Sequence, residues 1–447
     1  MDALTQYTDL YRQYRDRLRE GFPEAFNRAR DAACDALLAA GRFPRRGDEG
    51  YPLVSPEDLL APDYALNILR RPMDVTPAAF ACAQPGLGAH TVLMMGDTFV
   101  TAPESAPLPD GVEVMSFARA AAICPGLIAG DGCEVADPVV ALNTMLVQDG
   151  VFIRVREGVR CERPIQILNS FPPGAPWMAV RRVRIVLEHG AHITVLNCDH
   201  PRRSTHDTLS CRVTDISLAE GASLDLYDLE EDTARNNRLA YVGADQARGS
   251  RLNSCSVFIS GHVTRNRYNV RHSGTECLTE LGGLVIGAAG QQVDNSTYIA
   301  HEMPRCTSRQ LFKYALFDDS RGAYEGTVQV EHGAVLTDAR QTNRNLLGSP
   351  QAKMHAMPQL IIDCDDVKAS HGAATGQLDE RALFYMRSRG IPLDEARTML
   401  TRAFLTDVLD SIRPDSLRES LTSLVDKRLR GAGSTCDNCS LDHDLRH

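Results

Sequence analysis

Apolar residues recur every three or four positions near the start of the chain, which is the spacing of an amphipathic helix with one buried face. Over residues 4–20 this stripe consists of Leu4, Tyr7, Leu10, Tyr14 and Leu18. A second helix is predicted between Pro23 and Gly41, because proline is favoured in the first turn of a helix and glycine just beyond the last. Residues 55–58, Ser-Pro-Glu-Asp, have the form of a capping box that opens a short third helix. We therefore expect residues 1–75 to form an N-terminal helical region.

The helical spacing disappears at about residue 76, and short runs rich in β-branched and aromatic residues take its place. Examples are HTVLMM, VRIVLE, HITVLN and SLDLYDL, which are separated by Gly, Asn and Asp. The tetrapeptide Glu-His-Gly-Ala occurs at 188–191 and again at 331–334, and Ala-Glu-Gly-Ala at 219–222 is closely related to it. Each lies between two predicted strands. Gly190 and Gly221 are 31 positions apart, close to the length of one solenoid coil.

This strand-rich region extends to residue 376 without a predicted helix. A single β-sandwich, at about 100 residues, is too short to use so long a segment. The sequence therefore predicts a mainly β protein whose core, residues 76–376, is a right-handed parallel β-helix, or solenoid. A solenoid needs a cap at each end, and the helical segments on both sides would provide them.

Helical spacing returns at about Leu378. A helix that ends at Gly390 is followed by a longer one that Pro392 opens. The apolar stripe of the longer helix consists of Leu393, Ala396, Leu400, Phe404, Val408 and Ile412. Residues 416–419, Ser-Leu-Arg-Glu, predict a capping box for a last helix. We therefore assign residues 377–430 to a C-terminal helical domain and residues 431–447 to a flexible tail.

Composition adds limits on location and partners. Hydrophobic residues make up 43% and charged residues 24% of the 447 positions, and no run has the roughly 18 uninterrupted apolar residues of a membrane-spanning helix. We thus expect a soluble protein without a membrane partner. The formal charge of −10 disfavours non-specific binding of nucleic acid. The charged start lacks the layout of a secretory signal, which predicts a cytoplasmic protein whose thirteen cysteines are free thiols or metal ligands.

The tail holds four residues of metal-binding type. Cys436, Cys439, His443 and His447 follow the order C-x2-C-x3-H-x3-H and could close a tetrahedral zinc site. The three-residue linker between the two pairs is shorter than that of a usual zinc finger, and few apolar residues are available to pack such a module. The alternative is a disordered tail with incidental thiols.

The common catalytic signatures are absent from the sequence. It has no GxxxxGK[ST] phosphate loop, no GxSxG elbow and no HExxH motif. We therefore expect that the chain hydrolyses no nucleotide and that it is neither a common hydrolase nor a zinc protease. The alternative is a cytosolic β-helix enzyme that acts on carbohydrate, which would be supported by a dense cluster of carboxylates on one face. The Asp and Glu residues of this chain are dispersed instead.

A longer pattern leads from the last predicted strands into the C-terminal helices and has one counterpart near the start of the chain. In chain order it consists of GRFPRRGDEGYPL (41–53), TDARQ (337–341), NLL (345–347), PQL (358–360), DDVKASHGA (365–373), GQLD (376–379) and LFYMRSRGI (383–391). Together these segments resemble the SufD family, whose members are scaffold subunits of the SUF iron–sulfur cluster assembly machinery. SufB is a paralogue with the same fold, but SufB-like chains carry a Cys and an acidic, His-containing patch where this chain has Ala-Ser-His-Gly at 369–372. The resemblance is thus to SufD.

The resemblance implies a right-handed parallel β-helix that pairs with SufB through its last coils. It also implies that the C-terminal helices hold SufC subunits, which are ABC-type ATPases and hydrolyse the ATP. A transient iron–sulfur cluster is then expected at the SufB–SufD interface. In isolation, the chain is expected to be able to form a homodimer.

On this chain the resemblance carries a cluster-binding role onto His371 alone. A neutral imidazole is a competent iron ligand, and the alternative is that His371 only caps the end of the β-helix. Many SufD proteins have Cys where this chain has Ala369, and the nearest thiol is Cys364. Five residues apart on one extended strand, the two would lie on opposite faces, so we expect no replacement of one by the other. Phe384 and Tyr385 are the candidate contacts for SufC.

Overall fold

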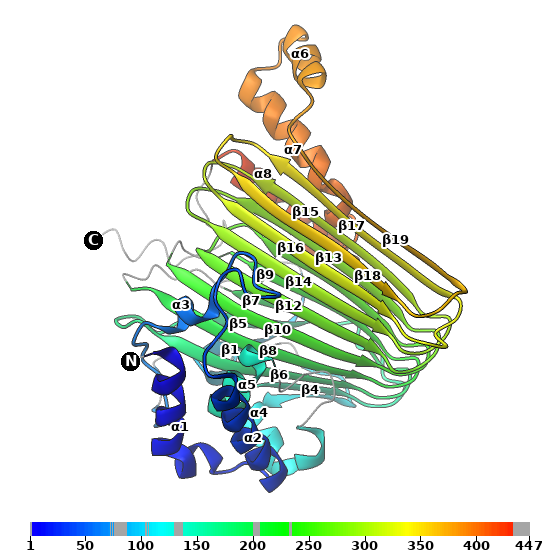
Figure 1. The fold of residues 1–447 in the computed structure, drawn as a ribbon. Coiled ribbons are helices and arrows are strands. Elements are labelled where there is room, and N and C mark those ends of the chain that lie inside the picture. The colour runs from blue at the N-terminus through cyan, green and yellow to red at the C-terminus, as the bar shows by residue number, and fades with distance from the viewer. Residues whose placement is uncertain are drawn as a thin grey trace.

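The computed structural model describes residues 2–71, 73, 75, 87–102, 105, 107–128, 137–199, 206–231 and 235–431. Its body is a stack of mostly parallel strands, with helices packed against it near both ends (Figure 1). This architecture confirms the predicted parallel β-helix with helical segments on both sides. The last coil of the solenoid positions His371, the candidate cluster ligand.

Each regular coil contributes one strand to each of two sheets. The odd-numbered strands other than β3, together with β2, form a ten-stranded sheet, and the remaining even-numbered strands, together with β3, form a nine-stranded sheet. Apart from β1–β2 and β3–β4, which are antiparallel, neighbouring strands are parallel. The strands are β1 (His90–Met95), β2 (Thr98–Thr101), β3 (Val112–Ser116), β4 (Asp149–Val155), β5 (Ile165–Ser170), β6 (Met178–Leu187), β7 (His192–Asp199), β8 (Thr208–Leu218), β9 (Ser223–Glu230), β10 (Asn236–Gln246), β11 (Arg251–Phe258), β12 (Val263–His272), β13 (Leu278–Gly287), β14 (Gln292–His301), β15 (Thr307–Leu316), β16 (Arg321–Val330), β17 (Thr337–Leu347), β18 (Lys353–Ile362) and β19 (Val367–Gly376).

The repeated tetrapeptides are the turns between the two sheets. Gly190 has φ +65° and lies between β6 and β7, and Gly221 has φ +68° and lies between β8 and β9. A side chain rarely adopts such a φ, which explains the glycine in each repeat. The amide of Gly190 donates to the carbonyl of Glu220 at 2.9 Å, so successive turns stack directly. The periodicity of the sequence thus marks the coils, as predicted.

Side chains alternate between the interior of the solenoid and its outer faces. In β7, Ile193 and Val195 point into the space between the sheets, whereas Leu196 and Cys198 point outward. Both sets are buried, because helices cover part of each outer face. A strand buried on both sides is a continuous apolar run, which is why these segments could be recognised in the sequence.

The N-terminal helices pack on the outer face of the nine-stranded sheet, and the C-terminal helices pack on the ten-stranded sheet. Within the C-terminal pair, Leu405, Val408 and Val425 are completely buried or nearly so. No helix among the described residues combines the length and apolar character needed to cross a membrane. The helices are α1 (Ala3–Arg19), α2 (Glu24–Ala40), α3 (Pro56–Leu60), α4 (Phe117–Ile123), the 3-10 helix η2 (Pro125–Leu127), α5 (Pro138–Leu146), α6 (Glu380–Ser388), α7 (Leu393–Leu409) and α8 (Asp415–Leu429).

Two local predictions are wrong. The range 76–376 is not free of helix, because it contains α4, η2 and α5. Residues 139–146 of α5 are all buried, so this helix has no exposed face and lacks the amphipathic spacing that would reveal it. The capping box predicted at 416–419 is absent, since α8 begins at Asp415 and Pro414 takes the N-cap position without a side-chain hydrogen bond.

A cluster of buried ion pairs crosses the interior of the solenoid. Arg212 of β8 and Arg238 of β10 come from one sheet, and Asp199 of β7 and Asp228 of β9 come from the other. Arg238 lies 3.0 Å from a carboxylate oxygen of Asp199 and is also hydrogen-bonded to Asp228. Burial alone would raise the pKa of Asp228, but the charges of the two arginines outweigh it and lower this pKa. The cluster therefore holds its charges in an interior where one unpaired ion would be costly.

We expect Arg238→Met to lower the free energy of unfolding by about 3–5 kcal/mol, because it leaves two buried carboxylates with one cation fewer. Arg235→Met is the matched control, since the Arg235 side chain is 55% exposed and pairs with Asp207 at 3.2 Å. Its expected cost is below about 1 kcal/mol. Urea unfolding followed by circular dichroism measures both. Equal midpoints for the two variants would contradict the importance of the buried cluster.

Candidate functional site

The solenoid ends on two strands that each have a free edge. Among the described residues, the backbone of β19 pairs only with β17, and that of β18 only with β16. Most side chains of β19 are exposed, and exposed side chains alternate with half-buried ones along β18. Pro358 in β18 has no amide proton, which is tolerated at an edge strand. An open edge of this kind can accept hydrogen bonds and apolar contacts from a partner.

His371 lies at this open end and connects the last strands of the two sheets. It belongs to β19 and stacks on Gln341 of β17, a buried residue that points into the solenoid. Its Nδ1 lies 3.0 Å from the carbonyl oxygen of Pro358 in β18, which belongs to the opposite sheet. A carbonyl only accepts, so Nδ1 carries the proton and Nε2 keeps a lone pair. His371 is exposed, and its Nε2 is therefore available as a ligand to an ion at the surface.

The prediction that Cys364 and Ala369 lie on opposite faces is wrong. Cys364 is in the turn that follows β18, and Ala369 is in β19, so the alternation of a single strand does not relate them. Both are half-buried and pack against the same small core group, which includes Val328 and Ala339. The thiol thus lies under the terminal coil on the same side as Ala369.

The first C-terminal helix presents two aromatic residues to solvent. Phe384 is 75% exposed and Tyr385 58% exposed, and Leu383 is the buried residue of α6. The guanidinium of Arg389 lies over the ring of Tyr385, 5.1 Å from its centroid. Figure 1 shows α6 projecting beyond the stacked strands, directly after β19 along the chain. The other predicted ligands, Cys436, Cys439, His443 and His447, lie outside the described residues.

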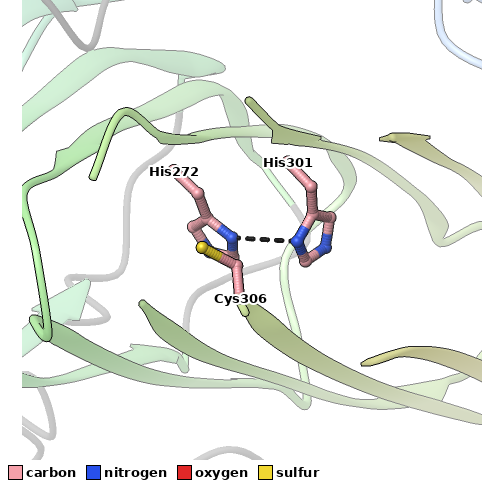
Figure 2. Close-up of side chains that lie close together, drawn as sticks. All are labelled: His272, His301 and Cys306. Carbon is pink, nitrogen blue, oxygen red and sulfur yellow. Dashed lines mark hydrogen bonds between the residues drawn. The ribbon is translucent and has the colours of Figure 1, made fainter. Parts of the chain in front are cut away.

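A second group of chemically active residues lies inside the solenoid. His272 at the end of β12 pairs with His301 at the end of β14, and their Nδ1 atoms are 3.1 Å apart (Figure 2). The ring planes are nearly perpendicular, at 88°. Cys306 joins them, and one ligand atom from each of the three residues lies within 4.8 Å of the others. All three are completely buried.

A fourth residue, Cys277, stands beside Cys306. The two thiols directly precede paired residues of β13 and β15, and both lie against the carbonyl oxygen of Gly274, at 3.1 Å for Cys277 and 3.3 Å for Cys306. Interaction with Cys277, and then with the two imidazoles, lowers the pKa of Cys306 against the effect of burial. Burial lowers the pKa of His301 to about 4, which keeps this imidazole neutral. The group therefore combines two imidazoles and two thiols.

The sequence carries a signal for this second group that a search for known motifs does not detect. His272 and Cys277 are separated by four residues, and His301 and Cys306 repeat this His-x4-Cys spacing. The two histidines are 29 positions apart, about the length of one coil. In a solenoid such a repeat places like residues on top of each other. Searching each coil for repeated chemistry would have identified the group.

Two family models match the chain. Residues 173–404 match the model described as SUF system FeS cluster assembly, SufBD core domain. Residues 1–167 match the SufBD protein N-terminal region. The core match includes the open end of the solenoid, α6 and the buried histidines.

Individual relatives are similar at modest identity. The iron–sulfur cluster assembly protein SufD of Escherichia coli is 29% identical over 300 residues, which cover 66% of this chain and 70% of that protein. A SufBD family protein of Synechocystis is 28% identical over 415 residues, or 89% of this chain and 90% of the relative. SufD of Bacillus subtilis is 26% identical over 307 residues, covering 67% and 69%.

The different burial of the two kinds of histidine predicts different effects on stability. We expect His371→Ala to change the free energy of unfolding by less than about 0.5 kcal/mol, because the side chain is exposed and makes one hydrogen bond. We expect His301→Ala to cost about 2–3 kcal/mol, because it removes the buried hydrogen-bond partner of Nδ1 of His272 and of the Ser308 hydroxyl. Thermal unfolding of both variants tests this. A large loss for His371→Ala would indicate a structural cap instead of an open ligand.

Proposed function

Because the chain belongs to the SufBD family of SUF iron–sulfur cluster assembly proteins, we propose that it is a SufD-like scaffold subunit. It pairs with a SufB paralogue, holds the SufC ATPase and carries out no catalysis itself. It works in the cytoplasm and binds no nucleotide, so ATP hydrolysis by the partner drives rearrangement of the complex. Family membership favours this function over the alternative of a carbohydrate-active β-helix enzyme.

The observation that carries the proposal is the open end of the solenoid, with an exposed histidine across it. Three large apolar side chains of β18 are also exposed there: Met357 by 39%, Ile361 by 43% and Ile362 by 41%. Free strand edges together with exposed apolar residues are typical of a surface that a partner covers. A SufB paralogue with the same fold would bring an open coil of its own and extend both sheets across the interface.

His371 then lies inside the interface and supplies one ligand to the nascent cluster. Its Nδ1 is engaged by Pro358, and this fixes the tautomer in which Nε2 can bind iron. An iron–sulfur cluster held by four thiolates from one chain would be closed. A single imidazole from this chain, completed by ligands of the partner, leaves a cluster that can be released.

The exposed pair Phe384 and Tyr385 on α6 forms the contact with SufC. Two neighbouring aromatic side chains on a projecting helix provide apolar area with little conformational entropy to lose. The rest of the C-terminal domain has a different task, since α7 and α8 cover the ten-stranded sheet. Deleting residues 378–430 would therefore uncover the core, and point substitutions on α6 are the better test.

We expect anaerobic affinity purification from native cells to recover both a SufB-like paralogue and an ABC-type ATPase, identified by mass spectrometry. The double variant Phe384→Ala/Tyr385→Ala should lose the ATPase by at least about 10-fold and keep the paralogue, because removing two anchor side chains typically costs more than about 1.4 kcal/mol. Ile123→Ala, at a residue 60% exposed on α4, is the control and should retain both. Recovery of the chain alone would contradict the scaffold function.

We expect His371→Ala to leave the purified complex assembled and to stop cluster formation. Because the imidazole contributes a ligand but little stability, the variant should lower the cluster yield without lowering the yield of assembled complex. Cluster yield is followed by absorbance and by iron and sulfide content after anaerobic reconstitution. His355→Ala is the control, because His355 is an exposed histidine of the same terminal coil that faces Glu325 at 3.7 Å. Normal cluster yield in His371→Ala would refute the assigned ligand.

The tail remains a separate proposal. Cys436, Cys439, His443 and His447 have the spacing of a zinc site, and zinc bound there could coexist with the scaffold function. Substituting the two tail cysteines distinguishes this site from any other metal site in the chain.

A further inference from the structure

We propose that His272, His301, Cys306 and Cys277 form a buried structural site for one divalent metal ion of the zinc class. The site lies inside the solenoid where two successive coils pass from one sheet to the other. Each coil supplies one histidine and one cysteine. This metal site is independent of the function proposed for the open end.

The hydrogen bonds around His272 define the tautomer in which its Nδ1 can bind a metal ion. The Thr279 hydroxyl donates its one proton to Oε1 of Gln246 at 2.5 Å, and it therefore accepts from Nε2 of His272 at 2.8 Å. The orientation of the Gln246 amide is set independently, because its nitrogen contacts the carbonyls of Ser250 and Leu278, each at 3.3 Å. With Nε2 protonated, Nδ1 of His272 presents a lone pair to the interior of the group.

His301 can take the matching form. Its Nε2 lies 2.9 Å from the hydroxyl of Ser308, which can either donate or accept. In the metal-free protein, Nδ1–H of His301 donates to Nδ1 of His272 at 3.1 Å. When Nε2 of His301 carries the proton and donates to Ser308, both Nδ1 atoms face the ion. Metal-bound histidines in proteins generally have such a hydrogen bond on the far ring nitrogen.

The distances among three of the four ligands and the charge of the complete set suit a tetrahedral site. Zn–N bonds of about 2.0–2.1 Å and Zn–S bonds of about 2.3 Å place neighbouring ligand atoms roughly 3.3–3.8 Å apart. The two Nδ1 atoms are 3.1 Å apart, and the three-residue group lies within 4.8 Å. Two thiolates balance the charge of a divalent ion, so the complete site is neutral, as its burial requires.

Cys277 is the ligand that changes most on binding. Its sulfur lies 3.1 Å from the carbonyl oxygen of Gly274 and 3.2 Å from that of Ala247, which favours the protonated thiol. The sulfur of Cys306 likewise lies 3.3 Å from the carbonyl oxygen of Gly274. On binding, both thiol protons leave to solvent and the sulfur of Cys277 turns to the ion beside Cys306. The ion would then connect two coils through four side chains and stabilise their stacking.

The test uses the full-length chain with Cys436→Ser and Cys439→Ser, which removes the tail thiols. The protein is unfolded in chelator and reductant, refolded with Co²⁺ or Zn²⁺, and freed of loose metal by gel filtration. We expect about one ion per chain, a thiolate-to-cobalt charge-transfer band and the intense d–d bands of tetrahedral cobalt. Zinc should also raise the melting temperature. No retained metal and no cobalt spectrum would overturn the proposal.

Variants locate the ion. Cys306→Ser and His301→Gln should each reduce the bound metal at least about 10-fold, in line with the effect of losing a ligand or its support. Cys161→Ser is the control, because Cys161 is a buried thiol of an early coil and should leave the metal content unchanged. Equal metal content in Cys306→Ser and the control would overturn the assignment. A Cys277–Cys306 disulfide and no metal in protein isolated from its native cells would also overturn it.

Discussion

The structure depends on one constraint, the hydrogen-bonded stacking of each coil on the previous one. Parallel ladders fix the register, so residues about one coil apart in the sequence lie directly above each other. Asn169, Asn197 and Asp228 show the result. Their side chains are hydrogen-bonded in series at 2.9 and 3.0 Å across steps of 28 and 31 positions. The same register stacks His301 on His272 and places Cys306 beside Cys277. Chemistry that is repeated along the chain is thereby concentrated at one point of the interior.

The constraint also determines where the chain can bind partners. Among the strands that the structure describes, those inside the stack are paired on both sides, and only the terminal strands have open edges. The last coil, β18 and β19, keeps these edges open and places His371 between them. The helices that follow are held firmly: Lys313 of β15 donates to the carbonyl of Phe404 at 2.6 Å and pairs with Asp407 at 2.5 Å. Because α7 is fixed to the sheet, α6 is carried outward with its aromatic residues exposed.

The sequence was sufficient to predict those elements whose residues follow a regular spacing. The stripe of α1, the left-handed glycine turns at Gly190 and Gly221, and the position of His371 near the end of the strands could all be inferred. The sequence did not reveal elements in which burial removes this pattern, as in α5, which is buried on every side. It also failed where a turn interrupts a strand, as between Cys364 and Ala369. The buried histidines escape notice when residues are weighed singly, because their meaning comes from the repeat.

The buried pair His272 and His301 and the exposed His371 illustrate how burial determines whether a histidine can hold an ion permanently or release it. An ion held by four side chains inside a dry, closely packed interior can leave only if the coils separate, so such a site favours stability over exchange. An imidazole at an open edge holds an ion only as long as a partner supplies the remaining ligands. Separation of the partner then removes most of the coordination at once. A scaffold that must release its cargo therefore needs the second arrangement at its interface, and its fold can use the first to keep the stack rigid while the partner moves.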